Sequence, residues 1–384
     1  MKKIVILGAT GSIGRSTLKV VAAHSGELAI VGIAAKSNWQ KLAEISRKFG
    51  VKNVAIFDVD AAREAKNSGS FPEGTRFLCG LDGICEIAQL AEADIVVSAV
   101  VGTLGLKPTL AAICAKKDIA FASKEILVLA GRFVMAAARN NGVKILPVDS
   151  EHNAIFQCIG GEPARHVARL ILTASGGAFR DWSLEEMRHV SPADALKNPN
   201  WIMGPKVTVD SASMANKGLE VIEATWLFGV PEDRIDVVVH PQSIVHSMVK
   251  FVDGTFLAQL APPSMTFPIQ NCLFYPQRVL GTVPSLDFSQ ALSLDFRAPD
   301  NEKYKCLRLA RACCRAGGGA PAIFNAANEV AVEAFLAGKI PYLEIPEIIE
   351  KTLETQVAGI PADLDAVLAT DAEARRIASS FVAR

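Results

Sequence analysis

The sequence carries no surplus charge of either sign. Its 384 residues include 40 basic and 40 acidic side chains, and the pI is about 7.0. Because electrostatic binding to nucleic acid or to an anionic membrane needs a basic excess, neither partner is expected. No apolar run approaches the length of a membrane span, and the apolar N-terminal stretch stops at Gly8 without the cleavage site of a signal peptide.

Paired-cysteine motifs are also missing. The chain has eight cysteines but no CxxC pair, and Cys313 and Cys314 are adjacent. This pattern argues against a structural zinc site and against a disulfide framework. Scattered thiols in a reducing compartment explain it more simply, and we therefore expect a cytoplasmic protein.

A glycine-rich turn stands near the N-terminus in a strand–turn–helix context. Residues 3–7 have the pattern of a buried parallel strand, GATGSIG follows at 8–14, and residues 15–23 have helical spacing. Glycines let the backbone approach a pyrophosphate, and a helix N-terminus favours an anion. The motif predicts a dinucleotide site, and the alternative is a purely structural turn.

The segment after a second predicted strand, 28–34, bears on the choice of dinucleotide. It contains Lys36, Ser37 and Asn38, where an NAD site usually places Asp or Glu. A cation beside small hydrogen-bond donors suits a 2′-phosphate, which favours NADP(H). The alternative is that Lys36 is a solvated loop lysine.

Strand-like and helix-like stretches alternate up to residue 148. Further strands are expected at 54–57, 95–101, 119–122 and 143–146, with helices that include 106–116 and 126–140. The alternation predicts an α/β fold built on a Rossmann-like, doubly wound parallel sheet. Ser123, Lys124 and Glu125 follow one of these strands, so they are either substrate contacts or an ordinary helix start.

The stretch PVDSEHNAIFQ, residues 147–157, brings two carboxylates close together. If the preceding strand continues through Asp149 and Glu151, both side chains point to one face. Two hard oxygen ligands there suit Mg²⁺ or Mn²⁺. The alternative is a polar turn in which Asp149 or Ser150 caps a helix.

The middle of the chain predicts an α+β domain with two phosphate-suited features. A strand at 170–174 leads into Ser175 and two glycines, a turn whose backbone N–H groups can hold a phosphate. A polar cluster of Ser211, Ser213, Asn216 and Lys217 precedes a helix at 219–228, which carries Glu220. Residues 207–210, just before this cluster, are expected to form a strand.

Residues 191–206 combine loop-forming residues with the large apolar side chains of Trp201 and Met203. This composition predicts a lid at about 195–205, and the alternative is a tryptophan tucked into the core. His240 and His246 match no zinc motif, so we expect them to be structural.

The last part of the chain is expected to be helical. A linker is predicted at 276–300, followed by helical spacing at 304–315, 326–337, 345–356 and 372–383. We therefore expect domains at 1–148, 149–275 and 301–384, the last a small helical bundle. Asn325, Asn328 and Glu329 are interpreted as capping residues.

Several motifs follow one another along nearly the whole chain: GATGSIG, SKE at 123–125, PVDSEHNAIFQ, ASGG at 174–177, NPNWIMGPK, VDSASMANKGLEVIEA, HPQSIVHSMV and NAANE at 325–329. Together they resemble the 1-deoxy-D-xylulose-5-phosphate reductoisomerase family. The resemblance implies a homodimer that rearranges 1-deoxy-D-xylulose 5-phosphate and reduces it with NADPH to 2-C-methyl-D-erythritol 4-phosphate. It also implies a divalent cation (Mg²⁺, Mn²⁺ or Co²⁺) and a place in the non-mevalonate isoprenoid pathway.

The same resemblance implies roles for single residues. The metal ligands would be Asp149, Glu151 and Glu220, with Lys124, Glu125 and Ser150 near the reacting part of the substrate. The phosphate would contact Ser175, Ser211, Asn216 and Lys217, and the lid residues Trp201 and Met203 would cover the substrate. The cofactor would contact Thr10, Gly11, Ser12, Ile13, Lys36, Ser37, Asn38, Ser123, Glu125 and Gly204.

Two positions depart from the family pattern. Asn198 stands where the lid motif usually has histidine, so it can contact the substrate but cannot carry a proton at neutral pH. Ser123 stands where asparagine is frequent, and a hydroxyl replaces one amide hydrogen bond but not two.

Two other functions stay compatible with the residues alone. One is another metal-assisted NADP oxidoreductase that reduces a sugar phosphate without rearranging it. The other is a regulatory protein that senses NADPH and has no turnover. The first would differ in its product, and the second predicts no NADPH oxidation with any sugar phosphate.

Overall fold

The chain folds as two compact units, seen in a computed structural model that describes residues 1–198, 200–201, 203–289 and 291–382. Unit 1 comprises Met1–Ile126, Val134–Asn153 and Ser264–Ser285. Unit 2 comprises Leu127–Phe133, Ala154–Pro263 and the chain from Leu286 onward. The three-domain division at 148 and 300 stays a prediction.

Unit 1 is built on a seven-stranded parallel sheet with the strand order β4-β3-β2-β1-β5-β6-β7. The strands are β1 (Lys2–Leu7), β2 (Leu28–Ala35), β3 (Asn53–Ile56), β4 (Arg76–Cys79), β5 (Ile95–Ser98), β6 (Asp118–Phe121) and β7 (Ile145–Pro147). The chain builds outward from β1 in one direction and then returns to build from β5 in the other. The doubly wound α/β fold is thereby confirmed, and its switch point lies between β1 and β5.

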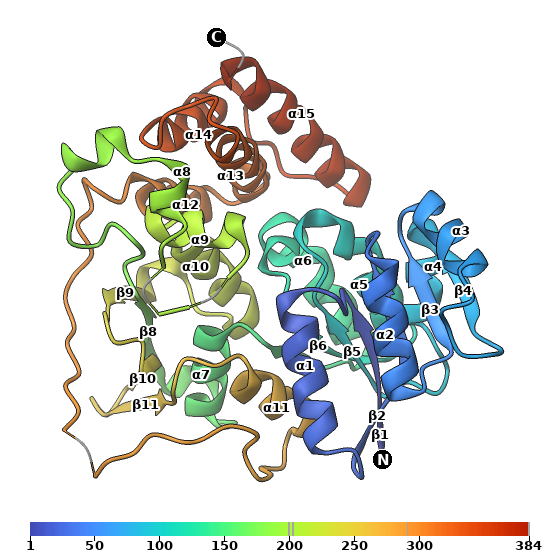
Figure 1. Cartoon of the computed structure of the whole chain (residues 1–384). Coiled ribbons are helices and arrows are strands. Elements are labelled where there is room, and N and C mark those ends of the chain that lie inside the picture. The colour runs from blue at the N-terminus through green and yellow to red at the C-terminus, as the bar shows by residue number, and fades with distance from the viewer. Residues whose placement is uncertain (199, 202, 290, 383–384) are drawn as a thin grey trace. The chain divides into compact units, whose positions relative to one another are not determined.

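Helices flank this sheet, most of them blue to teal in Figure 1. They are α1 (Ser12–Ala23), α2 (Trp39–Phe49), α3 (Val59–Asn67), α4 (Gly80–Ala88), α5 (Leu106–Cys114) and α6 (Lys124–Asn141), with η1 (Gly102–Gly105) before α5. Helix α11 (Thr266–Phe274), in ochre, is added from later in the chain. Since helices cover the sheet, β1 is buried along Ile4 to Leu7 at 0% exposure, which explains its unbroken apolar run. Strand β4 is short and partly exposed, so its sequence carried no strand signal.

Unit 2 contains a four-stranded mixed sheet with the order β11-β10-β8-β9. Its strands are β8 (Val167–Ala174), β9 (Ile235–Val239), β10 (Val245–Phe251) and β11 (Phe256–Leu260). β8 and β9 are parallel, whereas β10 is antiparallel to both β8 and β11. An α+β arrangement was expected for this region, and the sheet agrees with it.

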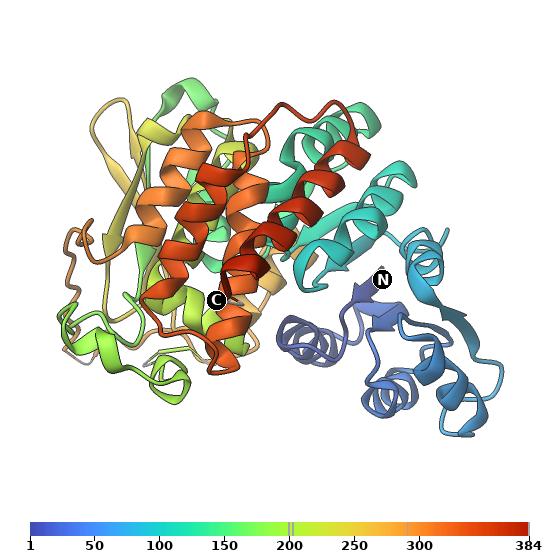
Figure 2. The same ribbon diagram turned by 90° about the horizontal axis from the view of Figure 1, so that it is seen from above.

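Helices occupy most of the remaining part of unit 2. They are α8 (Pro192–Ala195), α9 (Pro205–Ser213), α10 (Ala215–Phe228), α12 (Lys305–Ala316), α13 (Ala320–Leu336), α14 (Glu344–Thr355) and α15 (Leu364–Val382), with the short turns η2 (Ala164–His166), η3 (Glu186–His189) and η4 (Glu232–Arg234). Helix α7 (Ser150–Ile159) starts in unit 1 and ends in unit 2. Figure 2 shows α12 to α15 side by side, in orange to red, as the expected helical bundle.

The helix α13 forms the centre of that bundle. Its sequence is apolar nearly all round, and Ile323, Phe324 and Phe335 are 0–1% exposed. Such a helix is stable where neighbours cover every face, and α12, α14 and α15 pack against it. The expected end of the last helix at Ala383 lies outside the described residues.

One secondary-structure prediction was wrong in this part of the chain. Residues 207–210, expected as a strand, lie inside α9. Their Val-Thr-Val sequence favours strands, but Pro205 starts a helix and the buried Val209 and Ala212 pack into the helical core. The described residues of the expected linker, 276–300, contain no helix or strand longer than a single bridge at Arg297.

All eight cysteines are free thiols. Among the described residues, no helix is both long and apolar enough to cross a membrane.

Candidate active site

The predicted dinucleotide loop connects β1 to α1 at the switch point of the sheet. Gly8 has a φ of +88°, and a Cβ at Gly14 would lie 2.4 Å from the carbonyl oxygen of Ala9. Both glycines are therefore required for the tight turn and the close helix–strand packing. Thr10 and Gly11 lie in this turn, and Ser12 and Ile13 begin α1, whose N-terminus has no side-chain cap. The loop thus has the geometry that favours an anion.

The residues predicted to contact a 2′-phosphate follow β2, the strand beside β1. Lys36, Ser37 and Asn38 are all exposed there. The Asn38 side chain also caps α2, because its oxygen accepts a hydrogen bond of 3.1 Å from the Lys41 backbone N–H. Lys36 and Ser37 carry the cation and the hydroxyl that suit a phosphate.

Ser123 follows β6 and is 4% exposed. Its hydroxyl lies 2.7 Å from the carbonyl oxygen of Val100 and 3.3 Å from that of Ser98. The hydroxyl has one proton, so the shorter contact is the hydrogen bond that ties together the chain segments after β5 and β6. Contact with a cofactor stays a prediction for this residue.

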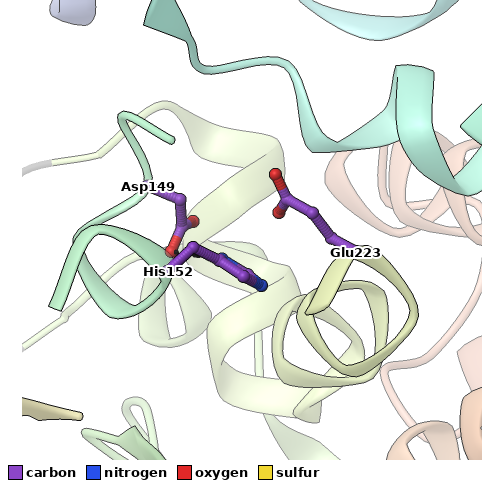
Figure 3. Close-up of side chains that lie close together, drawn as sticks. All are labelled: Asp149, His152 and Glu223. Atoms are coloured by element: carbon purple, nitrogen blue, oxygen red, sulfur yellow. Dashed lines mark hydrogen bonds and ion pairs between the residues drawn. The ribbon is translucent and has the colours of Figure 1, made fainter. Parts of the chain in front are cut away.

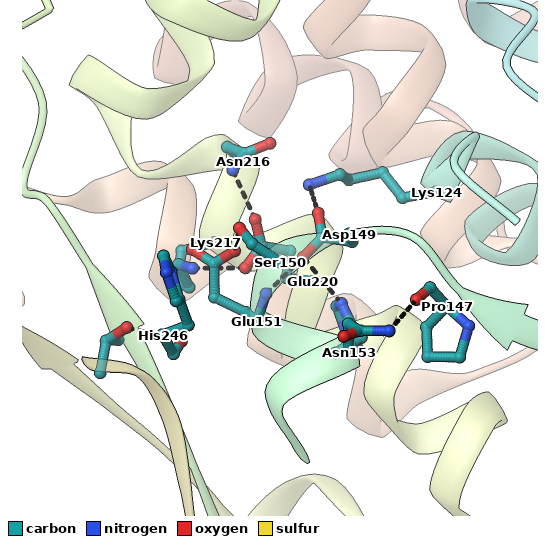
Figure 4. A network of polar contacts seen from close by, with 12 residues as sticks. Lys124, Pro147, Asp149, Ser150, Glu151, Asn153, Asn216, Lys217, Glu220 and His246 are labelled. Atoms are coloured by element: carbon teal, nitrogen blue, oxygen red, sulfur yellow. Dashed lines mark hydrogen bonds and ion pairs between the residues drawn. The ribbon is translucent and has the colours of Figure 1, made fainter. Parts of the chain in front are cut away.

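An ion pair joins the start of α6 to the segment after β7. The Lys124 ammonium lies 2.6 Å from Asp149 Oδ2, and both side chains are 11% exposed (Figure 4). Glu125, the next residue of α6, is 7% exposed. The two segments follow neighbouring strands β6 and β7, so the parallel sheet brings together residues that lie 25 positions apart.

The predicted strand through Asp149 and Glu151 is wrong. β7 ends at Pro147, and Ser150 already begins α7. The Asp149 carboxylate accepts a 3.1 Å hydrogen bond from the Glu151 backbone N–H, and its carbonyl accepts one of 2.8 Å from the Asn153 N–H. Asp149 therefore caps the helix, as the alternative interpretation held.

Capping the helix occupies only part of the hydrogen-bonding capacity of the Asp149 and Glu151 carboxylates. A carboxylate has about four acceptor sites. Ser150 donates a 2.6 Å hydrogen bond to Glu151 Oε2, and the His152 ring lies 3.1 Å from Asp149 Oδ1 (Figure 3). His152 is completely buried. Asp149 and Glu151 thus stand at one helix start with oxygens oriented by neighbouring donors.

In unit 2, Ser175 opens the turn after β8. Its hydroxyl accepts a 3.2 Å hydrogen bond from the Gly177 N–H. A Cβ at Gly177 would lie 2.4 Å from the Cα of Ala212, so this turn packs directly on α9. The packing places Ser175 close to the end of α9, where Ser211 lies.

A buried polar group lies one turn into α10. Asn216 donates a 2.5 Å hydrogen bond to Glu220 Oε1, and the Lys217 ammonium pairs with Glu220 Oε2 (Figure 4). Lys217 is 2% and Glu220 is 1% exposed. Burying a charged pair costs desolvation energy, so its presence here points to a function beyond stability.

Asn198 makes hydrogen bonds to two other residues of the predicted lid. Its side-chain oxygen accepts hydrogen bonds of 3.0 Å from the Asn200 N–H and 2.9 Å from the Trp201 N–H. Its amide donates a weak 3.4 Å bond to Ser211. The lid positions 199 and 202 lie outside the described residues, whereas Met203 is half-buried and Gly204 precedes α9.

The Trp201 ring lies 5.9 Å from the His246 ring, between centroids. Burial lowers the pKa of His246 to about 4, so this imidazole is neutral at physiological pH. His240 bonds the Asp295 carbonyl through Nδ1 at 2.8 Å and accepts from the Val245 N–H through Nε2 at 3.1 Å. The expected structural role of His240 agrees with these contacts.

The sequence did not predict the surroundings of two further polar residues. Asn328, interpreted as a cap, instead donates a 2.9 Å hydrogen bond to Asp210 of α9, which also pairs with Lys206 at 2.8 Å. Glu223 lies on α10 (Figure 3), three residues after Glu220, and it is completely buried. The sequence signal for both was the presence of polar residues in otherwise apolar helical patterns.

Family models match three parts of the chain. The model for 1-deoxy-D-xylulose 5-phosphate reductoisomerase matches residues 4–131, and the model for its C-terminal domain matches residues 145–228. A model described as the DXP reductoisomerase C-terminal domain matches residues 260–377.

Relatives and solved structures extend over the whole chain. The 1-deoxy-D-xylulose 5-phosphate reductoisomerase of Heliobacterium modesticaldum is 51% identical, covering 100% of this chain and 98% of its own length. That of Chloroherpeton thalassium is 47% identical, with 98% and 97% covered. A crystal structure of DOX-P reductoisomerase with NADPH, fosmidomycin and magnesium has a TM-score of 0.94 and 42% identity. The match covers 100% of this chain and 98% of that one. The Zymomonas mobilis enzyme in complex with NADPH has a TM-score of 0.93 and 42% identity, covering 99% of each chain.

Proposed function

Because the chain belongs to the 1-deoxy-D-xylulose 5-phosphate reductoisomerase family, we propose that the residues described above form its active site. The chain is an NADP-dependent oxidoreductase that rearranges 1-deoxy-D-xylulose 5-phosphate and reduces it to 2-C-methyl-D-erythritol 4-phosphate, a step of isoprenoid biosynthesis. Neither a reductase without rearrangement nor an NADPH sensor is favoured. The observation that carries the residue assignment is the buried Lys217–Glu220 ion pair, to which Asn216 adds a hydrogen bond.

The carboxylates fit a hard divalent cation. Asp149 and Glu151 offer oxygens at one helix start, and Glu220 offers a third carboxylate from α10. Oxygen donors of this kind suit Mg²⁺ and Mn²⁺. When bound, such a cation supplies Lewis acidity toward the substrate's carbonyl and hydroxyl oxygens.

Lys124 and Glu125 are proposed to act beside these carboxylates. The Lys124 ammonium, held at 2.6 Å by Asp149, is oriented to donate a hydrogen bond to a substrate oxygen that gains negative charge. Ser150, whose hydroxyl faces Glu151, is proposed to contact the same part of the substrate. Glu125 is proposed to line the adjoining cofactor position.

The phosphate of the substrate is proposed to bind at the junction of the Ser175 turn, α9 and α10. Ser175 and Ser211 supply hydroxyls, Asn216 an amide and Lys217 an ammonium. Charge-assisted bonds to a phosphate are strong, and this remote binding energy can drive closure of the lid. Asn198, Trp201 and Met203 then cover the substrate and exclude water.

NADPH is proposed to bind along unit 1. Thr10, Gly11, Ser12 and Ile13 would hold the pyrophosphate, and Lys36, Ser37 and Asn38 the 2′-phosphate. Ser123, Glu125 and Gly204 are proposed as further contacts. Bound NADPH supplies the hydride for the reduction.

A homodimer in the cytoplasm is proposed as the working form. The free cysteines suit a reducing compartment. The edge strand β11 exposes Phe256 at 54% and Leu257 at 52%, an apolar surface that pairing with a second copy would cover.

The test is NADPH oxidation with 1-deoxy-D-xylulose 5-phosphate and Mg²⁺ or Mn²⁺. We expect oxidation that stops with EDTA and returns with the cation, and NMR should identify a branched-chain polyol phosphate. Lys217→Ala should raise KM for the phosphorylated ketose, and an unchanged KM would reject its phosphate role. A product with an unbranched skeleton would reject the rearrangement.

A further inference from the structure

Two asparagines, Asn153 and Asn271, stabilise the turn that carries Asp149 and Glu151 through hydrogen bonds. Asn153 is the fourth residue of α7 and is 1% exposed. Its amide donates one hydrogen bond of 2.9 Å to the carbonyl of Pro147 and another of 3.1 Å to Asn271 Oδ1 (Figure 4 shows the first). Asn271 belongs to α11, 118 positions further along the chain, in the same unit.

Asn153 holds both ends of the turn. Its side chain bonds the last residue of β7, and its backbone N–H bonds the Asp149 carbonyl at 2.8 Å. The Pro147 carbonyl also accepts a 3.1 Å hydrogen bond from the Cys272 thiol of α11. Two buried donors bond this one carbonyl, so the end of β7 has little freedom to move. Asp149 lies only two residues after Pro147, and its position is therefore restricted as well.

The chemistry of position 153 requires an amide. Two amide hydrogens reach two acceptors at once, whereas a serine offers one donor and an aspartate offers none. The group is neutral, so its replacement by an uncharged residue alters geometry without altering the charge around the carboxylates. Metal ligands bind well when neighbouring groups fix their orientation before the ion arrives.

We propose that Asn153 and Asn271 are positioning residues that hold Asp149 and Glu151 in the geometry that binds the divalent cation. The inference rests on the proposed function of these two carboxylates. It assigns to α11 the task of supporting the metal-binding turn, in addition to packing against α1.

The test measures Mn²⁺ binding by electron paramagnetic resonance in the absence of substrate, together with thermal unfolding in EDTA. Asn153→Ala should weaken Mn²⁺ binding by about 10–100-fold, the usual effect of losing a group that orients a ligand. Asn271→Ala should weaken it less, because the Pro147 bond remains. Asn271→Asp keeps the acceptor and should bind Mn²⁺ at least as tightly as the unaltered chain.

Asn53→Ala is the matched control. Asn53 also donates a 2.9 Å hydrogen bond from its amide to a backbone carbonyl of unit 1, that of Val31, at the far end of the strands. Its replacement should cost stability but leave the Mn²⁺ affinity unchanged. A folded Asn153→Ala protein with unaltered affinity overturns the proposal, and if that variant does not fold, unaltered affinity in Asn271→Ala does so.

Failure of the proposed function gives a different result. Asp149→Asn should abolish tight Mn²⁺ binding whether or not the asparagines matter. If the unaltered chain binds Mn²⁺ no more tightly than Asp149→Asn, Asp149 is not a ligand, and the role of the asparagines in positioning it is refuted as well.

Discussion

The buried pair of Lys217 and Glu220 permits a prediction that separates stability from activity. Glu220→Gln keeps the size of the side chain and removes its charge. Both side chains are almost completely buried, so the Lys217 ammonium would lose the carboxylate that compensates its burial. Breaking a buried ion pair in this way costs about 3–5 kcal/mol, out of a typical total stability of about 5–15 kcal/mol.

The double variant Lys217→Met with Glu220→Gln isolates the electrostatic part of that cost. It removes both charges, and replacing a buried pair by neutral groups is often nearly neutral for stability. We therefore expect urea unfolding in EDTA to show a lower midpoint for Glu220→Gln and substantial recovery in the double variant.

Activity, unlike stability, should not recover in the double variant. Glu220→Gln should lose more than about 100-fold in turnover with Mn²⁺, since a ligand counts for more than a group that orients one. The double variant should stay inactive although it is folded. Full activity of Glu220→Gln would refute the metal assignment, and a double variant as unstable as the single one would refute the ion-pair argument.

Three further predictions concern pH, assembly and the anchor of α9. Burial lowers the pKa of His246 from 6.5 to about 4, so between these pH values the unfolded chain binds a proton that the folded chain does not. The stability contributed by this histidine should therefore fall as the pH drops from about 6.5 to about 4 and be level above 6.5. Urea unfolding of His246→Gln should lack this pH dependence. Leu257→Lys on the edge strand should shift a dimer toward monomers in sedimentation velocity, and an unchanged mass would exclude that edge as the interface. Asp210→Asn should lower the melting temperature. Adding Asn328→Asp restores a hydrogen bond between positions 210 and 328 but not the negative charge at position 210 that pairs with Lys206. Full recovery of the melting temperature in this double variant would mean that the Lys206–Asp210 ion pair contributes nothing to stability.

Local patterns were sufficient for much of the fold. The apolar run before Gly8, the glycine turn and the helical spacing after it follow from rules that act within a few residues, and the structure has them in place. The same holds for the bundle after residue 300, whose apolar periodicity marked all four helices. Residues 207–210 are one exception, because their β-branched side chains favour a strand while Pro205 and core packing impose a helix.

At the Asp149 turn, the sequence left open a metal-binding strand end and a helix cap, and the structure has the cap. Asp149 caps α7 through one oxygen and pairs with Lys124 through the other. The sequence could not reveal this, because capping depends on where the strand ends, and the strand end depends on pairing with β6.

By itself the sequence determined the α/β class, the glycine turn, the helical bundle and the identity of the polar residues at the site, since each depends on residue type and short-range spacing. The tertiary structure alone decided which of these residues meet. Lys124 with Asp149, Asn153 with Asn271 and Asp210 with Asn328 are separated by 25 to 118 positions. Such pairs form because sheet order and helix packing bring distant segments together, and no local pattern encodes that distance.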